Sequence, residues 1–426
     1  MQQYLIKLPS ETLSLIETCR TIAAKMKVRA YLVGGFVRDL IMGCPNLDLD
    51  ITVEGDGIDF AQNVAEKLNA HVLVHRRFGT ATISIGHHHK IDIASARKEI
   101  YPKPASLPEV SSGTLKDDLY RRDFTINTMA ISINSDDFGR LIDLFGGQQD
   151  LKKNYIRILH PASFIDDPTR ILRAIRFEQR YQFHLEPHTY RCLEEAVKKG
   201  MLEIVQPHRL RDELILILKE KQPPKYIHRI HRLCGLKFIH PHLKFTRHIQ
   251  RLLFSAGESL EWFDKNFPKH RTIERWLVYL LCLVDSLTLE EATLLGKRFA
   301  FRSSETNKIL SYLANRNQVL RRLSCVTIRP STVYQLLQPL ADEVILALLA
   351  NRKDKNLLHH IELFFRHYNK VSLSIKGKDL HQMGFTPGPQ YQHILRSVLH
   401  AKLDGIVKNH KEEREFVQRF KLKKKL

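Results

Sequence analysis

The feature that most constrains the fold is a change in hydrophobic period near residue 150. Before it, short runs of β-branched and apolar residues alternate with turn signals, and after it apolar residues recur every three or four positions. The first pattern is typical of short strands and the second of amphipathic helices. The sequence therefore predicts an α+β domain followed by helices. The expected strands are Ala30–Val33, Leu47–Val53, His71–Val74, Ala81–Ile85, Lys90–Ala94 and Met129–Ile133.

The part after residue 150 is expected to be helical throughout, because no strand-like alternation stands out in it. Its first helices are predicted at Arg170–Phe177, His188–Lys198 and Arg209–Lys219. The adjacent prolines Pro223 and Pro224 then break the chain. Domain boundaries near residue 145 and before this proline pair divide the chain into 1–145, 146–222 and 223–426.

Charge is distributed unevenly over the chain, which has a formal net charge of +21. Of its 67 Lys and Arg and 46 Asp and Glu residues, 17 and 19 lie in the first 150 positions, so the rest of the chain holds 50 and 27. This asymmetry predicts that one part performs chemistry while the other binds a polyanion, a nucleic acid or an anionic membrane. The longest apolar run, Trp276–Val284, is about half of a spanning helix, so membrane insertion is not expected.

The cysteines and the N-terminus indicate a cytoplasmic protein. The six cysteines are far apart and include no C-x-x-C pair, which argues against a disulfide framework or a zinc ribbon. The first twenty residues lack the pattern of a signal peptide. The histidines at 87–89 follow a glycine between two expected strands and indicate a hairpin tip rather than a metal site.

The densest functional signal is a strand that runs into Gly34 and Gly35 and then into a helix carrying Arg38. Glycines at a helix start let backbone N–H groups approach a phosphate, and the arginine adds a bidentate donor. Taken alone, the glycine pair is more typical of a simple strand-to-helix turn. Its combination with the acidic motif that follows favours a phosphate site.

Asp48 and Asp50 form that acidic motif. They lie two positions apart on an expected strand, so both carboxylates point to one face. Hard anionic oxygens on one face suit Mg²⁺ rather than a soft metal. Asp92, on a neighbouring expected strand, is a candidate third carboxylate. The alternative for Asp48 and Asp50 is a strand edge with solvated acids.

These motifs and four that follow them resemble, in order, those of class II tRNA nucleotidyltransferases and bacterial poly(A) polymerases. The resemblance covers roughly residues 31–180. It implies a nucleotidyltransferase head of the polymerase-β-like kind with a mixed sheet, followed by an all-helical neck and tail. The motifs are GGFVRD, DLDITVEG, Arg121–Asn127, Asp143–Leu151, Asp166–Arg170 and Arg173–Phe177.

The resemblance also implies roles for these residues. Asp48 and Asp50 would hold two Mg²⁺ ions that bring the RNA 3′-hydroxyl and the NTP α-phosphate together. Arg122, Asp123 and Asn127 fall at the motif that contacts ribose and triphosphate. The alternative for this second motif is a helix start capped by Asp123, with the neighbouring arginines in solvent.

Asp167 and Arg170 fall at the base-reading motif. Asp167 can accept a hydrogen bond from the exocyclic amine of C or A, and Arg170 can donate to the ring acceptors, which selects CTP and ATP against UTP and GTP. The alternative is that Pro168 begins a helix and Asp167 is its N-cap. Asp166 stands where the family has a glutamate, which puts any role of this first acid in doubt.

Two further segments have open alternatives. Arg173 and Arg176 continue the helix face at three-residue steps and either line the triphosphate channel or are ordinary surface arginines. The polar, proline-interrupted segment Arg97–Leu119 is by resemblance a flexible loop that moves between C and A addition. Its alternative is an uninvolved connection.

The expected activity is template-independent addition of C, A or both from CTP and ATP to the tRNA 3′ end, with the basic tail holding the tRNA acceptor end. The tail segments Gly377–Leu380 and Gly384–Pro389 resemble the A-adding branch slightly more. A poly(A) polymerase is the nearest alternative, because the same motifs serve both activities. A catalytically silent RNA-binding protein, which would be expected to have lost part of the site, and a small-molecule nucleotidyltransferase stay open as well.

Overall fold

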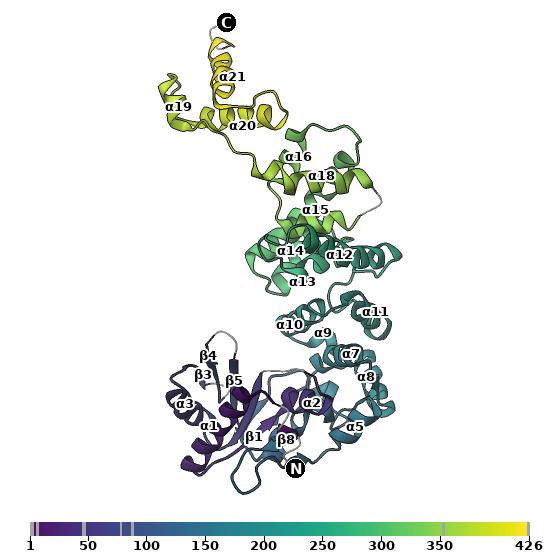
Figure 1. Cartoon of the computed structure of the whole chain (residues 1–426). Coiled ribbons are helices and arrows are strands. Elements are labelled where there is room, and N and C mark those ends of the chain that lie inside the picture. The colour runs from purple at the N-terminus through teal and green to yellow at the C-terminus, as the bar shows by residue number, and fades with distance from the viewer. Residues whose placement is uncertain are drawn as a thin grey trace. The chain divides into compact units, whose positions relative to one another are not determined.

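The computed structural model describes residues 4–5, 8–44, 48–76, 79–86, 89–351 and 354–423, with side chains described up to residue 419. The chain forms two compact units (Figure 1). The first unit contains the sheet, and the second is built from helices. The finer division at residues 145 and 222 stays a prediction. The first unit comprises Met1–Glu213 and Arg232–Cys234, and the second comprises Leu214–His231 and Gly235–Leu426.

The core of the first unit is a seven-stranded sheet with the order β3-β4-β5-β2-β1-β8-β9. All neighbours are antiparallel except β2 and β5, which are parallel, so the expected mixed sheet is confirmed. All six predicted strands are present in this sheet, and its only strand that was not predicted is the three-residue β9. The strands are β1 (Arg29–Val33), β2 (Leu49–Glu54), β3 (His71–His75), β4 (Thr80–Ile85), β5 (His89–Ser95), β8 (Met129–Ser132) and β9 (Leu141–Asp143).

Two of the sequence-based predictions fall on residues outside the described part of the chain. Leu47, the predicted first residue of a strand, is one of them, and His87 and His88 are the others. His89 is described: it begins β5, and its Nε2 lies 3.0 Å from a carboxylate oxygen of Glu11.

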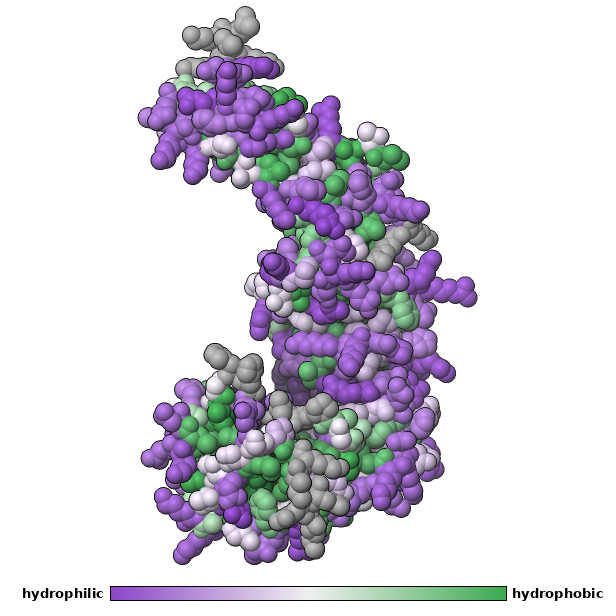
Figure 2. Space-filling model, in the orientation of Figure 1, coloured by the Kyte–Doolittle hydropathy of each residue, from purple (hydrophilic) through white to green (hydrophobic). Residues whose placement is uncertain are grey.

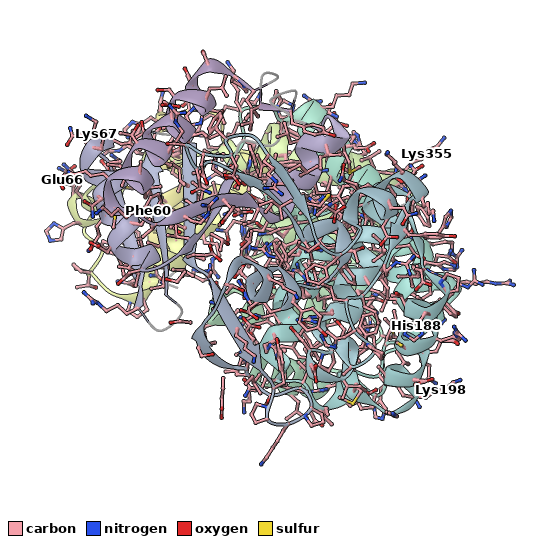
Figure 3. All side chains as sticks on the ribbon, turned by 90° about the horizontal axis from the view of Figure 1, so that it is seen from below. Phe60, Glu66, Lys67, His188, Lys198 and Lys355 are labelled. Atoms are coloured by element: carbon pink, nitrogen blue, oxygen red, sulfur yellow. The ribbon has the colours of Figure 1, made fainter. Side chains whose placement is uncertain are left out.

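The two faces of β2 differ, as the alternation of its residues requires. Leu49, Ile51 and Val53 are buried on one face, over which α3 (Gly57–Leu68) packs together with α1 (Ser10–Met26). Helix α3 is amphipathic: Phe60 is fully buried, whereas Glu66 and Lys67 are exposed (Figure 3). One face of the central strand is therefore committed to the hydrophobic core.

The opposite face of β2 is polar and is attached to α4 (Leu115–Tyr120). Glu54 accepts a hydrogen bond from the backbone N–H of Leu115 at 2.7 Å, and Thr52 donates one to Asp118 at 3.2 Å. Asp50 lies on this same face, near the beginning of the strand. Helix α4 is therefore fixed on the side of the sheet that carries the predicted metal ligand.

The segment Arg97–Leu119, predicted by resemblance to be a flexible loop, contains regular structure, and its movement stays a prediction. β6 (Arg97–Ile100) and β7 (Glu109–Ser112) pair as an antiparallel hairpin, and α4 begins at Leu115 after its cap Thr114. Only the segment between the two strands, which holds the three prolines, is irregular. Both strands are short and mostly polar, so they lack the apolar alternation by which strands are recognised in a sequence.

The helices predicted after residue 150 are confirmed as α7 (Thr169–Tyr181), α8 (Pro187–Lys198) and α10 (Pro207–Leu218). The break at Pro223 is also confirmed, because this proline begins α11 (Pro223–Cys234). The expectation of no strands is wrong at one place, where two-residue strands, β10 and β11, pair in parallel. These strands are β10 (Tyr155–Ile156) and β11 (His184–Leu185).

The remaining helices complete both units. Among the described residues no single helix is long and apolar enough to cross a membrane. Two helices, α16 (Pro330–Leu337) and α17 (Asp342–Leu349), pass that test only when they are joined across a bend of 112°. The remaining helices of the first unit are α2 (Gly34–Met42), α5 (Gly147–Lys153), α6 (Ser163–Asp166) and α9 (Met201–Ile204). Those of the second are α12 (Arg247–Asn266), α13 (Arg275–Leu283), α14 (Leu289–Arg298), α15 (Ser303–Leu323), α16 (Pro330–Leu337), α17 (Asp342–Leu349), α18 (Lys355–Arg366), α19 (Gly377–Gln382), α20 (Pro389–Leu403) and α21 (His410–Lys423).

The turn that leads into α5 holds a short 3-10 helix, η3 (Thr125–Asn127), in place. Asp143 accepts a hydrogen bond from the backbone N–H of Gly147, and Asp150 accepts one from the hydroxyl of Thr125 at 2.6 Å. A Cβ added to Gly147 would lie 2.4 Å from the carbonyl oxygen of Thr125. The glycine is therefore required by close approach of two backbone segments.

Gly147→Ala is expected to lower the free energy of unfolding of the first unit by about 1–3 kcal/mol, because the methyl group forces η3 away from α5. Gly377→Ala is the matched control: it also begins a helix, but its Cβ would meet the ring of Tyr391 at 3.6 Å, an ordinary contact. Urea unfolding followed by circular dichroism measures both. Equal unfolding midpoints for the two variants would contradict the close-approach argument.

Candidate active site

A cavity of about 490 Å³ in the first unit gathers the predicted site residues. Its volume is within the usual range for small-molecule sites. Eleven of the twelve predicted residues line it, and Asp48 is the exception. The lining residues are Gly34, Gly35, Arg38, Asp50, Glu99, Tyr101, Arg121, Arg122, Asp123, Asn127, Asp167, Arg170, Arg173, Arg176, Phe177 and Arg180.

The acidic side of the cavity is built by strand pairing. Asp50 on β2 is the register partner of Asp92 on the parallel strand β5, so the expected third carboxylate lies on the same face. Asp48 precedes β2 and is exposed. Burial raises the pKa of Asp50 to about 6. The charge of Arg122 lowers this pKa, whereas the charges of Asp92 and Asp48 raise it further. A desolvated carboxylate beside other acids is stabilised by a bound cation.

Asp92 differs from Asp50 in that it already has partners. It accepts a hydrogen bond from the hydroxyl of Thr82 at 2.5 Å and one from the ammonium group of Lys90 at 2.5 Å. Its negative charge is therefore partly compensated by a neighbour on its own strand. Asp92 can influence Asp50 through charge without being a direct ligand.

Gly34 lies directly beneath Arg122. A Cβ added to Gly34 would be 2.7 Å from Nη1 of Arg122 and 3.7 Å from a carboxylate oxygen of Asp50. The φ angle of Gly34 is +68°, a conformation that favours glycine. The start of α2, the β2 carboxylate and a guanidinium group are thus brought into direct proximity at one edge of the cavity.

Asp118 of α4 fixes both arginines of the Arg-Arg-Asp motif. It is fully buried, and it accepts hydrogen bonds from Arg121 at 2.6 Å and from Arg122 at 2.8 Å. Burial alone would raise the pKa of Asp118, but the two guanidinium groups outweigh this and lower it. The alternative of two solvated arginines is therefore wrong. Nε of Arg122 is buried and has no hydrogen-bond partner among the described residues.

A chain of hydrogen bonds connects α2 with α7. Arg38 donates to the amide oxygen of Asn127 at 2.6 Å, Asn127 donates to Asp123 at 2.8 Å, and Arg173 donates to Asp123 at 2.6 Å. Burial opposes ionisation of Asp123, but the Arg173 charge and these hydrogen bonds prevail and lower its pKa to about 2. Asp123 is thus a permanently charged anchor for the arginines around it.

The basic side of the cavity is one face of α7. Arg170, Arg173 and Arg176 are three residues apart and all line the cavity, as helical spacing requires. Arg176 is only 7% exposed, so the alternative of an ordinary surface arginine is wrong for it. Arg173 also forms an ion pair with Glu213 of α10 at 3.2 Å.

Asp167 serves as a cap and also lines the cavity. Its Oδ1 accepts hydrogen bonds from the backbone N–H of Thr169 at 3.1 Å and from Arg209 at 2.8 Å. The helix starts at Thr169, one residue before the predicted Arg170 and one after Pro168, where the capping alternative began it. Among the residues that the structure describes, none donates to Oδ2 of Asp167, so one oxygen supports the helix while the other is available to a ligand.

Arg170 is held rigidly beside Asp167. Its guanidinium group donates to the hydroxyl of Ser163 at 2.7 Å and to the carbonyl oxygen of Arg121 at 2.7 Å. These two bonds leave further N–H groups of the planar guanidinium for a ligand. The two residues of the predicted base-reading motif therefore both line the cavity, each oriented by its own neighbours.

Sequence reasoning missed several residues that position this site. Arg209 and Glu213 of α10 contact Asp167 and Arg173, and Glu99 of the hairpin accepts a hydrogen bond from Arg121. The spacing of Arg209 and Glu213, four apart on a predicted helix, was the available signal that they share a face. Nothing in the sequence indicated which face would contact α7.

Comparison with known proteins identifies similar chains. Residues 30–157 match the family model of the poly A polymerase head domain. The chain is 39% identical to the A-adding tRNA nucleotidyltransferase of Geobacter sulfurreducens, over 93% of this chain and 46% of that protein. It is 37% identical to that of Aquifex aeolicus, over 83% and 43%. The chain thus spans less than half the length of these two relatives.

Other relatives are matched over almost their whole length. The chain is 33% identical to the A-adding tRNA nucleotidyltransferase of Halalkalibacterium halodurans, over 97% of this chain and 93% of that protein. Two solved structures also align over 98% of both chains. One, described as a CCA-adding enzyme in apo form II, has a TM-score of 0.83 and 36% identity. The other, the Thermotoga maritima CCA-adding enzyme complexed with tRNA, has a TM-score of 0.77 and 34% identity.

The agreement extends from the sheet that carries Asp50 through the helices of the second unit, so it concerns the whole chain and not the head domain alone. The chain therefore belongs to the class II tRNA nucleotidyltransferase family, whose members carry the poly A polymerase head domain.

Proposed function

We propose that this chain transfers AMP from ATP to the 3′ end of a tRNA that already ends in CC. This step is common to A-adding and CCA-adding enzymes. The observation that carries the proposal is that the three relatives described above, matched over 83–97% of this chain, are A-adding enzymes. By contrast, a CC-adding enzyme of Deinococcus radiodurans matches 45% of this chain.

Synthesis of the complete CCA end is the second candidate. It is favoured by the solved structures of CCA-adding enzymes, one with ATP and one with CTP, which cover 98% of this chain at 34% identity. Poly(A) synthesis and catalytically silent RNA binding are the third and fourth candidates. All four outcomes can be distinguished by the length and composition of the product.

Asp48 and Asp50 are the residues that would hold the divalent cation on which this family typically depends. Their fit to Mg²⁺ rests on the donor set, which consists of carboxylate oxygens, and on the burial of Asp50, whose raised pKa reflects a charge in need of a counterion. When bound, Mg²⁺ supplies positive charge to the triphosphate and the leaving pyrophosphate. The carboxylates of Asp48 and Asp50 would position the ion.

The arginines of the cavity would bind the triphosphate. Arg122, Arg173 and Arg176 are held by buried carboxylates, so their orientation is set before substrate binds and little reorganisation is required. The backbone N–H groups at Gly34 and Gly35, where α2 begins, would donate hydrogen bonds to a phosphate at close range. No side chain of the site needs to act as a covalent nucleophile, because the tRNA 3′-hydroxyl is the attacking group.

Asp167 and Arg170 would select the base. The exocyclic amine of adenine or cytosine would donate to Oδ2 of Asp167, and Arg170 would donate to a ring acceptor. Guanine and uracil carry a carbonyl oxygen at the equivalent position, which a carboxylate repels. The rigid anchoring of both side chains makes this discrimination independent of a nucleic-acid template.

The proposal assigns chemistry to residues 1–145, base selection to 146–222 and tRNA binding to 223–426. Hydrophilic side chains dominate much of the visible face of the helical region (Figure 2). The excess of basic residues there would neutralise phosphates of the tRNA acceptor end without reading bases. A cytoplasmic location is part of the proposal, and it is consistent with six cysteines that form no disulfide bond in the described part of the chain.

Asp50→Asn is expected to reduce nucleotide incorporation by about a thousandfold or more. The substitution removes a charge that would hold the cation, and the cation would stabilise the transition state by several kcal/mol. Asp59→Asn, an exposed acid on α3, is the control. Incorporation of labelled ATP into a CC-ended tRNA measures the effect, with circular dichroism to verify folding. Wild-type activity of the folded Asp50→Asn enzyme would disprove the assignment.

Asp167→Asn is expected to lower kcat/KM for ATP by about 10- to 100-fold and to raise the GTP-to-ATP ratio, since the amide retains an oxygen for Thr169 and Arg209 but offers an N–H₂ donor to the base. Asp166→Asn is the matched control, because this neighbour does not line the cavity. Steady-state kinetics with all four nucleotides tests both. Unchanged selectivity in Asp167→Asn would rule out the base-reading role.

The proposed activity is tested with three tRNA transcripts, one lacking CCA, one ending in CC and one ending in CCA, each with ATP and CTP separately and together in Mg²⁺. Extension of the CC-ended transcript by a single A, and of no other, is the expected result. Stepwise completion that stops at CCA identifies the second candidate. Long A tails on all three indicate a poly(A) polymerase, and no incorporation refutes the catalytic proposal.

A further inference from the structure

Three side chains that can bind a metal meet in the second unit, apart from the cavity described above. His240 and His242 lie in the connection between α11 and α12, and Glu291 lies in the first turn of α14. Their ligand atoms are all within 4.8 Å of one another. No other trio of His, Cys, Asp or Glu in the described part of the chain satisfies that criterion.

We propose that His240, His242 and Glu291 bind a Zn²⁺ ion that fastens the α11–α12 connection to the start of α14. Two imidazoles and one carboxylate are a donor set that Zn²⁺ accepts in three-ligand sites, with water as the fourth ligand. Mg²⁺ prefers oxygen ligands and is disfavoured by imidazole. The site is therefore distinct in chemistry from the carboxylate site at Asp48 and Asp50.

The hydrogen bond between two of the ligands marks the position for a cation. Nδ1 of His242 is hydrogen-bonded to Oε1 of Glu291, so a proton lies between an imidazole nitrogen and a carboxylate oxygen. A metal ion can replace that proton and bind both atoms. The His242 side chain is 73% exposed, and so it can rotate to bring the three ligand atoms to Zn²⁺ bonding distance.

The other atoms of the site orient the ligands. Oε2 of Glu291 accepts a hydrogen bond from the backbone N–H of Thr288 at 2.9 Å, in the capping box of α14, and this leaves Oε1 for the metal. Nδ1 of His240 accepts a hydrogen bond from the backbone N–H of His242 at 3.3 Å, which leaves Nε2 as its ligand atom. Such secondary contacts fix ring and carboxylate orientation in known metal sites.

Arg298 places a positive charge near His240. Arg298 also donates a hydrogen bond to the carbonyl oxygen of Ile239 at 3.2 Å, so it is held nearby and repels a cation. We therefore expect weaker binding than at a four-ligand structural zinc site.

Bound Zn²⁺ would stabilise the second unit. His242 and Glu291 are 49 residues apart in sequence, so the ion would cross-link two distant segments of the chain. A ligand that binds the folded state but not the unfolded chain raises the unfolding temperature, and the rise grows with ligand concentration. This effect is independent of the nucleotidyl transfer proposed above.

The experiment uses the full chain without a polyhistidine tag, after chelation and dialysis. Zn²⁺ titration calorimetry, thermal unfolding with Zn²⁺ or Mg²⁺, and the visible spectrum of the Co²⁺-substituted protein are compared among variants. His242→Gln removes a largely exposed ligand, and Glu291→Gln retains an oxygen that can accept from Thr288, so both are expected to fold. His381→Gln, an exposed histidine on α19, is the matched control.

The wild type and His381→Gln are expected to bind one more equivalent of Zn²⁺ than His242→Gln and Glu291→Gln. They should also show an unfolding temperature several degrees higher with Zn²⁺ than with Mg²⁺, and a tetrahedral Co²⁺ spectrum. Equal stoichiometry and equal Zn²⁺-dependent unfolding shifts in all four proteins would overturn the proposal, as would a shift of the same size with Mg²⁺.

Discussion

An anionic substrate pocket needs positive charge, and the guanidinium groups that supply it repel one another. In this protein, buried carboxylates resolve the conflict. Asp118 holds Arg121 and Arg122, and Asp123 and Glu213 share Arg173. The rest of the cavity depends on these ion pairs because they fix the orientation of the arginines. The residues that form the pairs come from α4, α7 and α10 and from the segment that follows α4.

The acidic side of the cavity is organised by the opposite principle. Within the described part of the chain Asp50 has no ion pair of its own, and its register partner Asp92 adds a further negative charge beside it. Burial without full compensation is unfavourable for folding and favourable for cation binding. The cavity thus combines preorganised positive charge on one side with unbalanced negative charge on the other, which is what the proposed triphosphate and metal sites require.

The sequence predicted most of the fold, and eleven of the twelve predicted site residues line the cavity. Strong alternation identified the central strands, and the three-residue spacing of Arg170, Arg173 and Arg176 predicted one helix face. The β6–β7 hairpin was missed because its strands are short and polar. Arg209 was missed because its importance comes from a contact with Asp167, 42 residues away, which no local pattern encodes.

The sequence by itself determined which arginines share a face of α7 and that glycines stand at the start of α2. The shared face predicted for Asp48 and Asp50 stays a prediction, because β2 begins at Leu49, after Asp48. Local periodicity is sufficient for the arginines, because backbone geometry fixes side-chain direction. Only the tertiary structure decided which side-chain atoms are already used, with Oδ1 of Asp167 bonded to Arg209 and Arg122 held over Gly34. Such contacts join distant elements, and hydrogen-bonding capacity is assigned only after those elements have packed together.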